Sequence, residues 1–146
     1  MKKQAYTLIG ALVFATMFAV STATAQSANQ LVANIPFEFS AGNQKLPAGK
    51  YSVSVISSSD QKVLRLRQLD GRNSIVVQMH AVEGKAQDGG RMVFHRYGDS
   101  YFLAQTFAAA DSIGLEAAKS RSEKAIEREL ASSSRKMETV ALSTRR

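Results

Sequence analysis

The chain has 146 residues, no cysteine, no tryptophan and a formal net charge of +7. This length predicts a single domain. The absence of cysteine excludes disulfides, thiolate zinc sites, iron–sulfur clusters and cysteine nucleophiles. Only two histidines, His80 and His95, are present, so a histidine-rich metal site is also excluded.

The N-terminal residues have the pattern of a secretory signal peptide. Lys2 and Lys3 precede the apolar run Tyr6–Val20, and Ala23–Ala25 gives the small-x-small pattern that signal peptidase cleaves. A membrane-spanning helix needs about 20 apolar residues, and this run is shorter and has no basic stop-transfer cluster after it. We therefore predict a signal peptide over residues 1–25, no transmembrane segment after cleavage, and a periplasmic or extracellular location.

The next region, residues 26–112, is predicted to form an antiparallel β domain. Its apolar residues alternate with polar ones, which is typical of half-buried strands, and short turns rich in Gly, Pro and Asp separate the runs. This pattern predicts an all-β fold, either a sandwich or a small barrel. The predicted runs are Ile35–Phe39, Tyr51–Val55, Leu64–Arg67, Ile75–Ala81, Met92–Tyr97 and Tyr101–Phe107.

The pattern changes toward the C-terminus. Residues 113–131 are rich in helix-forming residues and are predicted to form one helix, with Ser120 and Glu123 in capping-box positions. Its apolar stripe is thin and consists mainly of Ile126 and Leu130. The remaining residues, 132–146, have few large apolar side chains and are predicted to be disordered.

Four segments carry a resemblance to other proteins: VANIPFEF, LPAGKYSV, LRLRQLDGRNS and VFHRYGDSYFLAQ, followed by SRSEKAIEREL. Over residues 31–131 the chain resembles a group of small exported proteins of unknown function from acidobacterial-type soil bacteria. The resemblance implies export from a bacterial cell and an all-β domain. It carries no activity and no site residues.

Two groups of residues could in principle support catalysis. Gly98, Asp99 and Ser100 resemble the motif of one esterase family, but a tight turn explains all three residue types. A serine nucleophile also needs a base and an acid, and His95 is the nearest candidate base in the sequence. A glycosidase would need a carboxylate pair. The candidate carboxylates are Glu38, Asp60, Asp70, Glu83, Asp88 and Asp99, most of them in predicted turns.

Metal and cofactor sites are not predicted. His80 and His95 could bind a metal with Asp99 or Glu83, but a metal site needs three or four converging ligands and no such spacing occurs. No phosphate-binding loop or dinucleotide motif is present. We expect no cofactor.

Three arginines, Arg65, Arg67 and Arg96, are the predicted binding residues. Arg65 and Arg67 alternate with Leu64 and Leu66, so both should point outward from one strand. An exported basic surface suits an anionic envelope component, and export argues against nucleic acid as a partner. The competing interpretation is a solvated strand face whose cations prevent edge pairing.

The aromatic residues allow two interpretations. They could line a cavity for a small apolar ligand, or they could fill the core, as side chains do in small barrels. These residues are Phe37, Phe39, Tyr51, Phe94, Tyr97, Tyr101, Phe102 and Phe107. We favour core packing. A three-residue loop, Gly98–Ser100, is also predicted to place Tyr97 opposite Tyr101 and to leave Phe94 and Phe102 on the other face of the hairpin.

Taken together, these patterns predict an exported, non-enzymatic β domain that acts as a binding or envelope-associated module. The alternative is a small secreted hydrolase that uses Ser100 or a carboxylate pair.

Overall fold

The structure, a computed structural model, describes residues 30–58, 61–131 and 137–145. The predicted signal peptide, residues 1–25, lies outside the described residues. The first five strands are β1 (Gln30–Ile35), β2 (Phe39–Ala41), β3 (Gln44–Leu46), β4 (Gly49–Ser58) and β5 (Gln61–Gln68). The other elements are β6 (Ser74–Glu83), β7 (Gly90–Tyr97), β8 (Ser100–Phe107), β9 (Ile113–Ala117), helix α2 (Arg121–Ala131) and β10 (Glu138–Arg145).

Eight strands close into an antiparallel barrel, which confirms the all-β prediction. Their order around the ring is β8-β7-β10-β1-β4-β5-β6-β9, and β9 pairs back onto β8. The short β2–β3 hairpin stands outside this ring. It is joined to β8 through a single parallel pair, Ser40 with Phe102.

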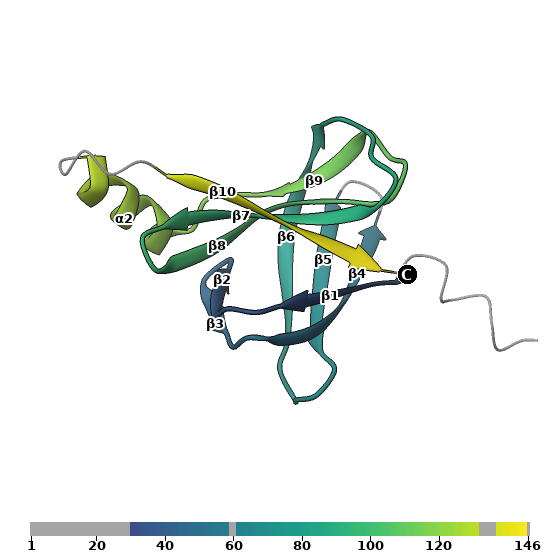
Figure 1. The fold of residues 1–146 in the computed structure, drawn as a ribbon, viewed down its shortest axis with the longest axis horizontal. Helices are drawn as coiled ribbons and strands as arrows, with labels where there is room; N and C mark the ends of the chain where they lie inside the picture. Colours follow the sequence, from purple (N-terminus) through teal and green to yellow (C-terminus); the bar gives the residue numbers. More distant parts are fainter. Residues whose placement is uncertain (1–29, 59–60, 132–136, 146) are drawn as a thin grey trace, which may run out of the picture.

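The ring consists of two curved sheets that meet at two short seams. At one seam β1 pairs with β10 only at Val32 and Ala33, and at the other β8 pairs with β9 only at Gln105 and Thr106. Strands β7, β8 and β10 run across β4, β5 and β6 (Figure 1). The fold is therefore a barrel whose two sheets cross, as in orthogonally packed β proteins.

The barrel interior is filled with apolar side chains that alternate along the strands. Phe39, Tyr51 and Phe94 pack edge to face, with ring centroids 5.4 and 5.5 Å apart. The Tyr51 hydroxyl donates a hydrogen bond to the carbonyl of Pro47 at 2.7 Å, which satisfies its polar end. The interpretation of these three aromatic residues as core is confirmed. The buried core comprises Ala33, Ile35, Phe39, Ala41, Leu46, Tyr51, Val53, Leu64, Leu66, Ile75, Val77, Met79, Met92, Phe94, Leu103, Leu115 and Ala117.

The C-terminal prediction was wrong in two places. The first part of the predicted helix, residues 113–117, is strand β9, and the helix covers only Arg121–Ala131. Residues 138–145 of the predicted disordered tail form strand β10. This strand is ordered because it pairs with β7 along almost its whole length and with β1 at its end, and because Leu142 packs against the core.

The predicted register of the β7–β8 hairpin was also wrong. Its loop has two residues, Gly98 and Asp99, so Tyr97 lies opposite Ser100 and not opposite Tyr101. Gly98 has a φ of 60°, a left-handed value that glycine adopts without strain and that two-residue hairpin loops require. As a result Phe102 lies opposite His95, and Phe102 and Phe94 point to different faces of the hairpin.

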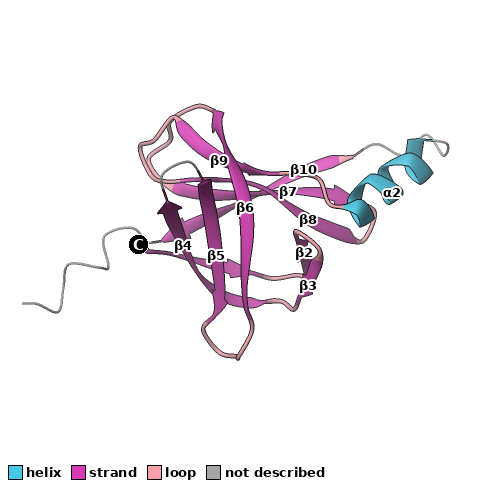
Figure 2. Ribbon diagram, turned by 180° about the vertical axis from the view of Figure 1, so that it is seen from behind, coloured by secondary structure: helices cyan, strands magenta, loops and turns pink. Residues whose placement is uncertain are grey.

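Helix α2 stands at one end of the barrel, beyond the β7–β8 hairpin (Figure 2). Ser120 begins it as predicted, because its Oγ accepts a hydrogen bond from the backbone N–H of Glu123 at 3.1 Å. Glu123 is almost fully buried against β7, and Ile126 is half-buried. The helix therefore docks on the outer surface of the barrel. None of the helices in the described ranges is both long and apolar enough to span a membrane.

Candidate functional site

Arg65 and Arg67 lie side by side on the outer surface of β5, as predicted. Their side chains are exposed, and they are separated by one residue, hence by about 7 Å along the strand. The register places Arg65 between Ser54 and Val76. Arg67 lies between Ser52 and Ser74 in the same way. Within the described ranges neither guanidinium group forms an ion pair.

The position of β5 bears on the edge-protection interpretation of these arginines. β5 pairs with β4 on one side and with β6 on the other, so it is a central strand. Cations that protect a sheet from edge-to-edge pairing belong on edge strands. Protection of an edge therefore does not explain Arg65 and Arg67.

Apolar side chains lie next to the arginines on the same outer surface. Val76 is 60% exposed beside Arg65, and Ile56 is 37% exposed opposite the half-buried Val63. We call the five residues Ile56, Val63, Arg65, Arg67 and Val76 the β5 face. It combines exposed branched aliphatic groups with two cations that have no ion-pair partner among the described residues.

Arg96 does not belong to this face. It lies on β7, which the ring order places on the opposite side of the barrel from β5. Its guanidinium group donates hydrogen bonds to the carbonyl of Gly98 at 2.8 Å and to Glu138 at 3.2 Å, and it lies 5.7 Å from the Tyr101 ring centroid. The structure thus separates Arg96 from the other two predicted binding residues and gives it partners within the barrel.

Ser100 and His95, the nucleophile and base of the alternative serine hydrolase, are close in sequence but are not hydrogen-bonded to each other. Ser100 lies opposite Tyr97, whereas His95 lies opposite Phe102, so the two side chains are diagonal neighbours about 7–8 Å apart. In the described part of the chain no hydrogen bond links Ser100 to His95. His95 instead uses its Nδ1 to bind Glu123, at 2.7 Å from Oε1.

The two histidines that could have bound a metal lie on different strands. His80 is exposed on β6 opposite Glu116, and His95 is on β7. Across the described ranges, no group of three or more His, Asp or Glu side chains could hold a metal ion.

A buried carboxylate between α2 and β7 is a feature that the sequence analysis missed. Glu123 is 3% exposed, and its Oε1 accepts hydrogen bonds from His95 Nδ1 and from the Tyr97 hydroxyl at 3.3 Å. An ionised carboxylate can only accept hydrogen bonds, so Nδ1 of His95 is the donor when Glu123 is ionised. The capping-box pattern gave Glu123 a local role at the helix start, and only the docking of α2 on β7 shows its second role.

The pKa values of several side chains near the Glu123 carboxylate are shifted. Burial raises the pKa of the Tyr97 hydroxyl, and the negative charge of Glu123 raises it further. Lys119 and Glu127 form an ion pair at 2.5 Å near the same helix. Their hydrogen bond raises the pKa of the Lys119 ammonium and lowers the pKa of the Glu127 carboxyl.

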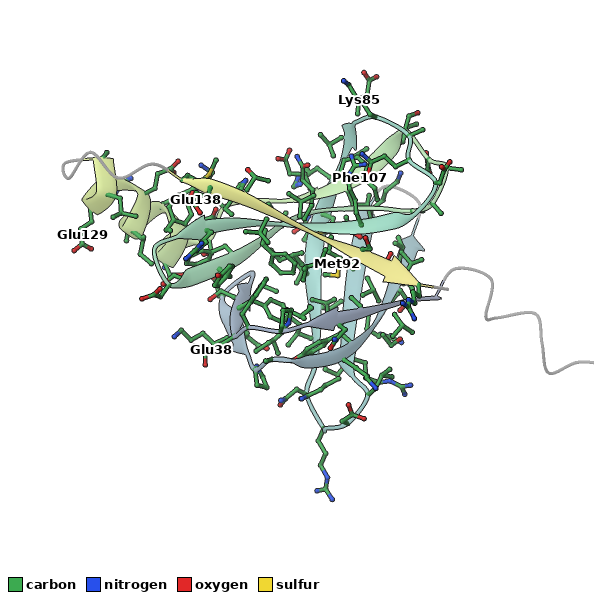
Figure 3. The ribbon with its side chains drawn as sticks, in the orientation of Figure 1. Glu38, Lys85, Met92, Phe107, Glu129 and Glu138 are labelled. Carbon is green, nitrogen blue, oxygen red and sulfur yellow. The ribbon has the colours of Figure 1, made fainter. Side chains whose placement is uncertain are left out.

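A pocket of about 380 Å³ lies between the β2–β3 hairpin, the β7–β8 turn and α2. Glu38 points away from the barrel at this end (Figure 3). We call this cavity the hairpin pocket. Its lining consists of Glu38, Phe39, Ser40, Asn43, Lys45, Asp99, Ser100, Tyr101, Phe102, Ser122 and Ile126.

Comparison with known proteins gives no relative. No family model matches the chain, and neither the curated proteins nor the solved structures contain a significant match.

Proposed function

We propose that the chain is an exported, non-enzymatic domain that binds the surface of an anionic phospholipid membrane through the β5 face. The observation that carries the proposal is the position of Arg65 and Arg67. Both are exposed and without an ion-pair partner in the described part of the chain, and both lie on a central strand where edge protection is not needed.

The apolar part of the face favours a membrane over a soluble polyanion. Val76 and Ile56 expose aliphatic groups beside the arginines. A membrane surface offers both phosphate groups for the guanidinium ions and a boundary region for short apolar side chains. An anionic glycan would leave these aliphatic groups in water. The signal-peptide pattern of residues 1–25 supports the proposal because it would bring the domain to the cell envelope.

The expected affinity is modest and sensitive to salt. Each Lys or Arg near an anionic membrane surface contributes about 1 kcal/mol, so the two arginines together account for about a 30-fold change in binding. Such a contribution is lost as the ionic strength rises. The proposed attachment is therefore peripheral and reversible.

Co-flotation with vesicles tests the proposal. The protein is expressed with its signal peptide and purified after export, and N-terminal sequencing should find Gln26 first. We expect binding to phosphatidylglycerol vesicles, none to phosphatidylcholine vesicles, and a loss of about 30-fold in the double variant Arg65→Gln, Arg67→Gln.

The matched control is the double variant Arg121→Gln, Arg128→Gln, which removes the same charge from exposed positions of α2. It should retain nearly all of the binding. An equal loss in both variants would show that net charge alone drives association. Binding to a sulfated glycan without binding to the anionic vesicles would overturn the assignment to a membrane.

A further inference from the structure

We propose that the hairpin pocket binds a small, neutral, polyhydroxylated ligand of the size of a single sugar ring. The pocket volume of about 380 Å³ is at the lower end of the range found for small-molecule sites, roughly 300–1,000 Å³. Its walls are separate from the β5 face, so the inference does not depend on membrane binding.

The pocket lies between the start of strand β8 and two elements that the barrel does not need for closure. The β2–β3 hairpin forms a single strand pair with the ring, Ser40 with Phe102, and its Phe39 packs into the core. Helix α2 is held against β7 by the hydrogen bonds of Glu123. Neither element is part of the eight-stranded ring, and together with the β7–β8 turn they enclose the pocket.

The polar groups in the pocket are available to a ligand. The side chains of Ser40, Asn43, Asp99 and Ser100 line it and form no hydrogen bond within the described part of the chain. They offer hydroxyl, amide and carboxylate groups at the same cavity. Ligand hydroxyls can donate to a carboxylate and can both donate to and accept from serine and asparagine side chains.

The charges and the apolar walls restrict the class of ligand. Glu38 and Lys45 form an exposed ion pair at 3.0 Å, and Asp99 adds a second negative charge. The paired charges of Glu38 and Lys45 largely cancel, so the remaining carboxylate of Asp99 repels an anion. Because Asp99 is exposed, its attraction for a cation changes the affinity by at most about fivefold, and hydrogen bonding to hydroxyl groups sets the ligand class. Phe102 and Ile126 supply an apolar wall, which suits the C–H face of a sugar ring.

Amide chemical shifts of the isotope-labelled protein test the inference. Glucose, galactose, mannose and N-acetylglucosamine are each titrated to about 50 mM, because a ligand of this size is expected to have a Kd of about 1 mM. At least one sugar should shift amides in residues 38–45, 98–102 and 121–126. Saturable shifts confined to these segments would support the site.

Two pocket variants and one control variant complete the experiment. Asp99→Asn preserves the turn, since asparagine is also common there, and Ser100→Ala removes one hydroxyl. Each should weaken sugar binding at least about fivefold, corresponding to loss of one hydrogen bond. The control Ser74→Ala, at an exposed position of β6, should bind sugar like the parent protein.

Three results would overturn the inference. The first is the absence of saturable shifts with all four sugars. The second is binding that both pocket variants leave unchanged. The third is tighter binding of ethanolamine or inorganic phosphate than of any sugar, which would show that the pocket selects a charged ligand.

Discussion

The carboxylate of Glu123 joins helix α2 to the barrel through His95, with 2.7 Å between Oε1 and Nδ1. The two residues are distant in the sequence, and one lies on the first turn of α2 while the other lies on the outer surface of β7. The same oxygen accepts the hydroxyl of Tyr97, so one buried carboxylate satisfies two donors of the strand. A buried polar contact thus helps to hold the helix on the barrel.

Replacement of Glu123 by alanine should destabilise the protein by about 1–3 kcal/mol, because it leaves the His95 and Tyr97 donors without their partner in a buried site. Urea denaturation followed by circular dichroism measures this change. Lys124→Ala, at the next and exposed position of the helix, is the control and should change the stability by less than about 0.5 kcal/mol. Equal effects of the two substitutions would contradict the role of Glu123.

Alkaline pH should weaken the folded state. The folded-state pKa values of Tyr97 and Tyr51 lie above the ordinary 10.0 because burial disfavours the tyrosinate form. The folded protein then retains protons that the unfolded chain releases, so stability is fully present below pH 10 and falls as the pH rises through the folded values. Lys119, whose pKa is also raised, acts in the same direction.

Tyr97→Phe tests this dependence. The variant should lose stability less steeply above pH 10 than the parent protein, by up to about 1.4 kcal/mol per pH unit for the missing proton. Urea denaturation at a series of alkaline pH values provides the slopes. Identical slopes would show that Tyr97 is not part of the alkaline transition.

The sequence predicted the central strands well, because each buries one face and so alternates clearly. Strand β5 shows this most directly, with Leu64 and Leu66 inside and Arg65 and Arg67 outside. It did not predict β10, whose inward side chains are few and whose order depends on pairing with strands far away in the sequence. Residues 113–117 were predicted as helix for a related reason. Their Glu and Ala have high helix propensity, so the composition does not indicate the short strand.

A substitution pair tests the register of β10. Leu142 packs against the core, whereas the side chain of the adjacent Ala141 is exposed on the outer surface. Leu142→Glu should therefore cost about 1–3 kcal/mol, since it places a carboxylate at a half-buried apolar site, and Ala141→Glu should be nearly neutral. Thermal unfolding measures both. Equally small effects would mean that residues 138–145 do not pair as described.

Gly114 should tolerate no side chain. A Cβ atom there would lie 2.4 Å from the Phe107 ring and 2.8 Å from the carbonyl oxygen of Thr106, and the backbone oxygen cannot move away easily. Phe107 lies beneath the loop that carries Lys85 (Figure 3), and Arg91 covers its ring at 4.1 Å.

We expect Gly114→Ala to destabilise the protein by about 1–3 kcal/mol through overpacking. Gly89→Ala is the matched control, because a Cβ atom at Gly89 would meet nothing within 4 Å. Denaturant midpoints of the two variants give the comparison. A Gly114→Ala variant as stable as Gly89→Ala would contradict the packing of Phe107 on β9.

The candidate site was predictable only in part. Strand alternation was sufficient to place Arg65 and Arg67 on one outer surface, but it could not show that β5 is central. The separation of Arg96 follows from the order of strands around the ring, which no local pattern encodes. The hairpin pocket and the contact between Glu123 and His95 depend on the docking of α2, so they required the tertiary structure.

The fluorescence of a label at position 76 in the presence of vesicles tests the proposed function most directly. The chain has no cysteine, so Val76→Cys provides a single thiol on the β5 face for an environment-sensitive fluorophore. With phosphatidylglycerol vesicles at low salt, the label at Val76 should shift its emission to the blue and return on addition of about 0.5 M salt. The same label at Ala118→Cys, exposed near α2, should not respond. An unchanged emission at Val76, or an equal shift at both positions, would contradict membrane binding through the β5 face.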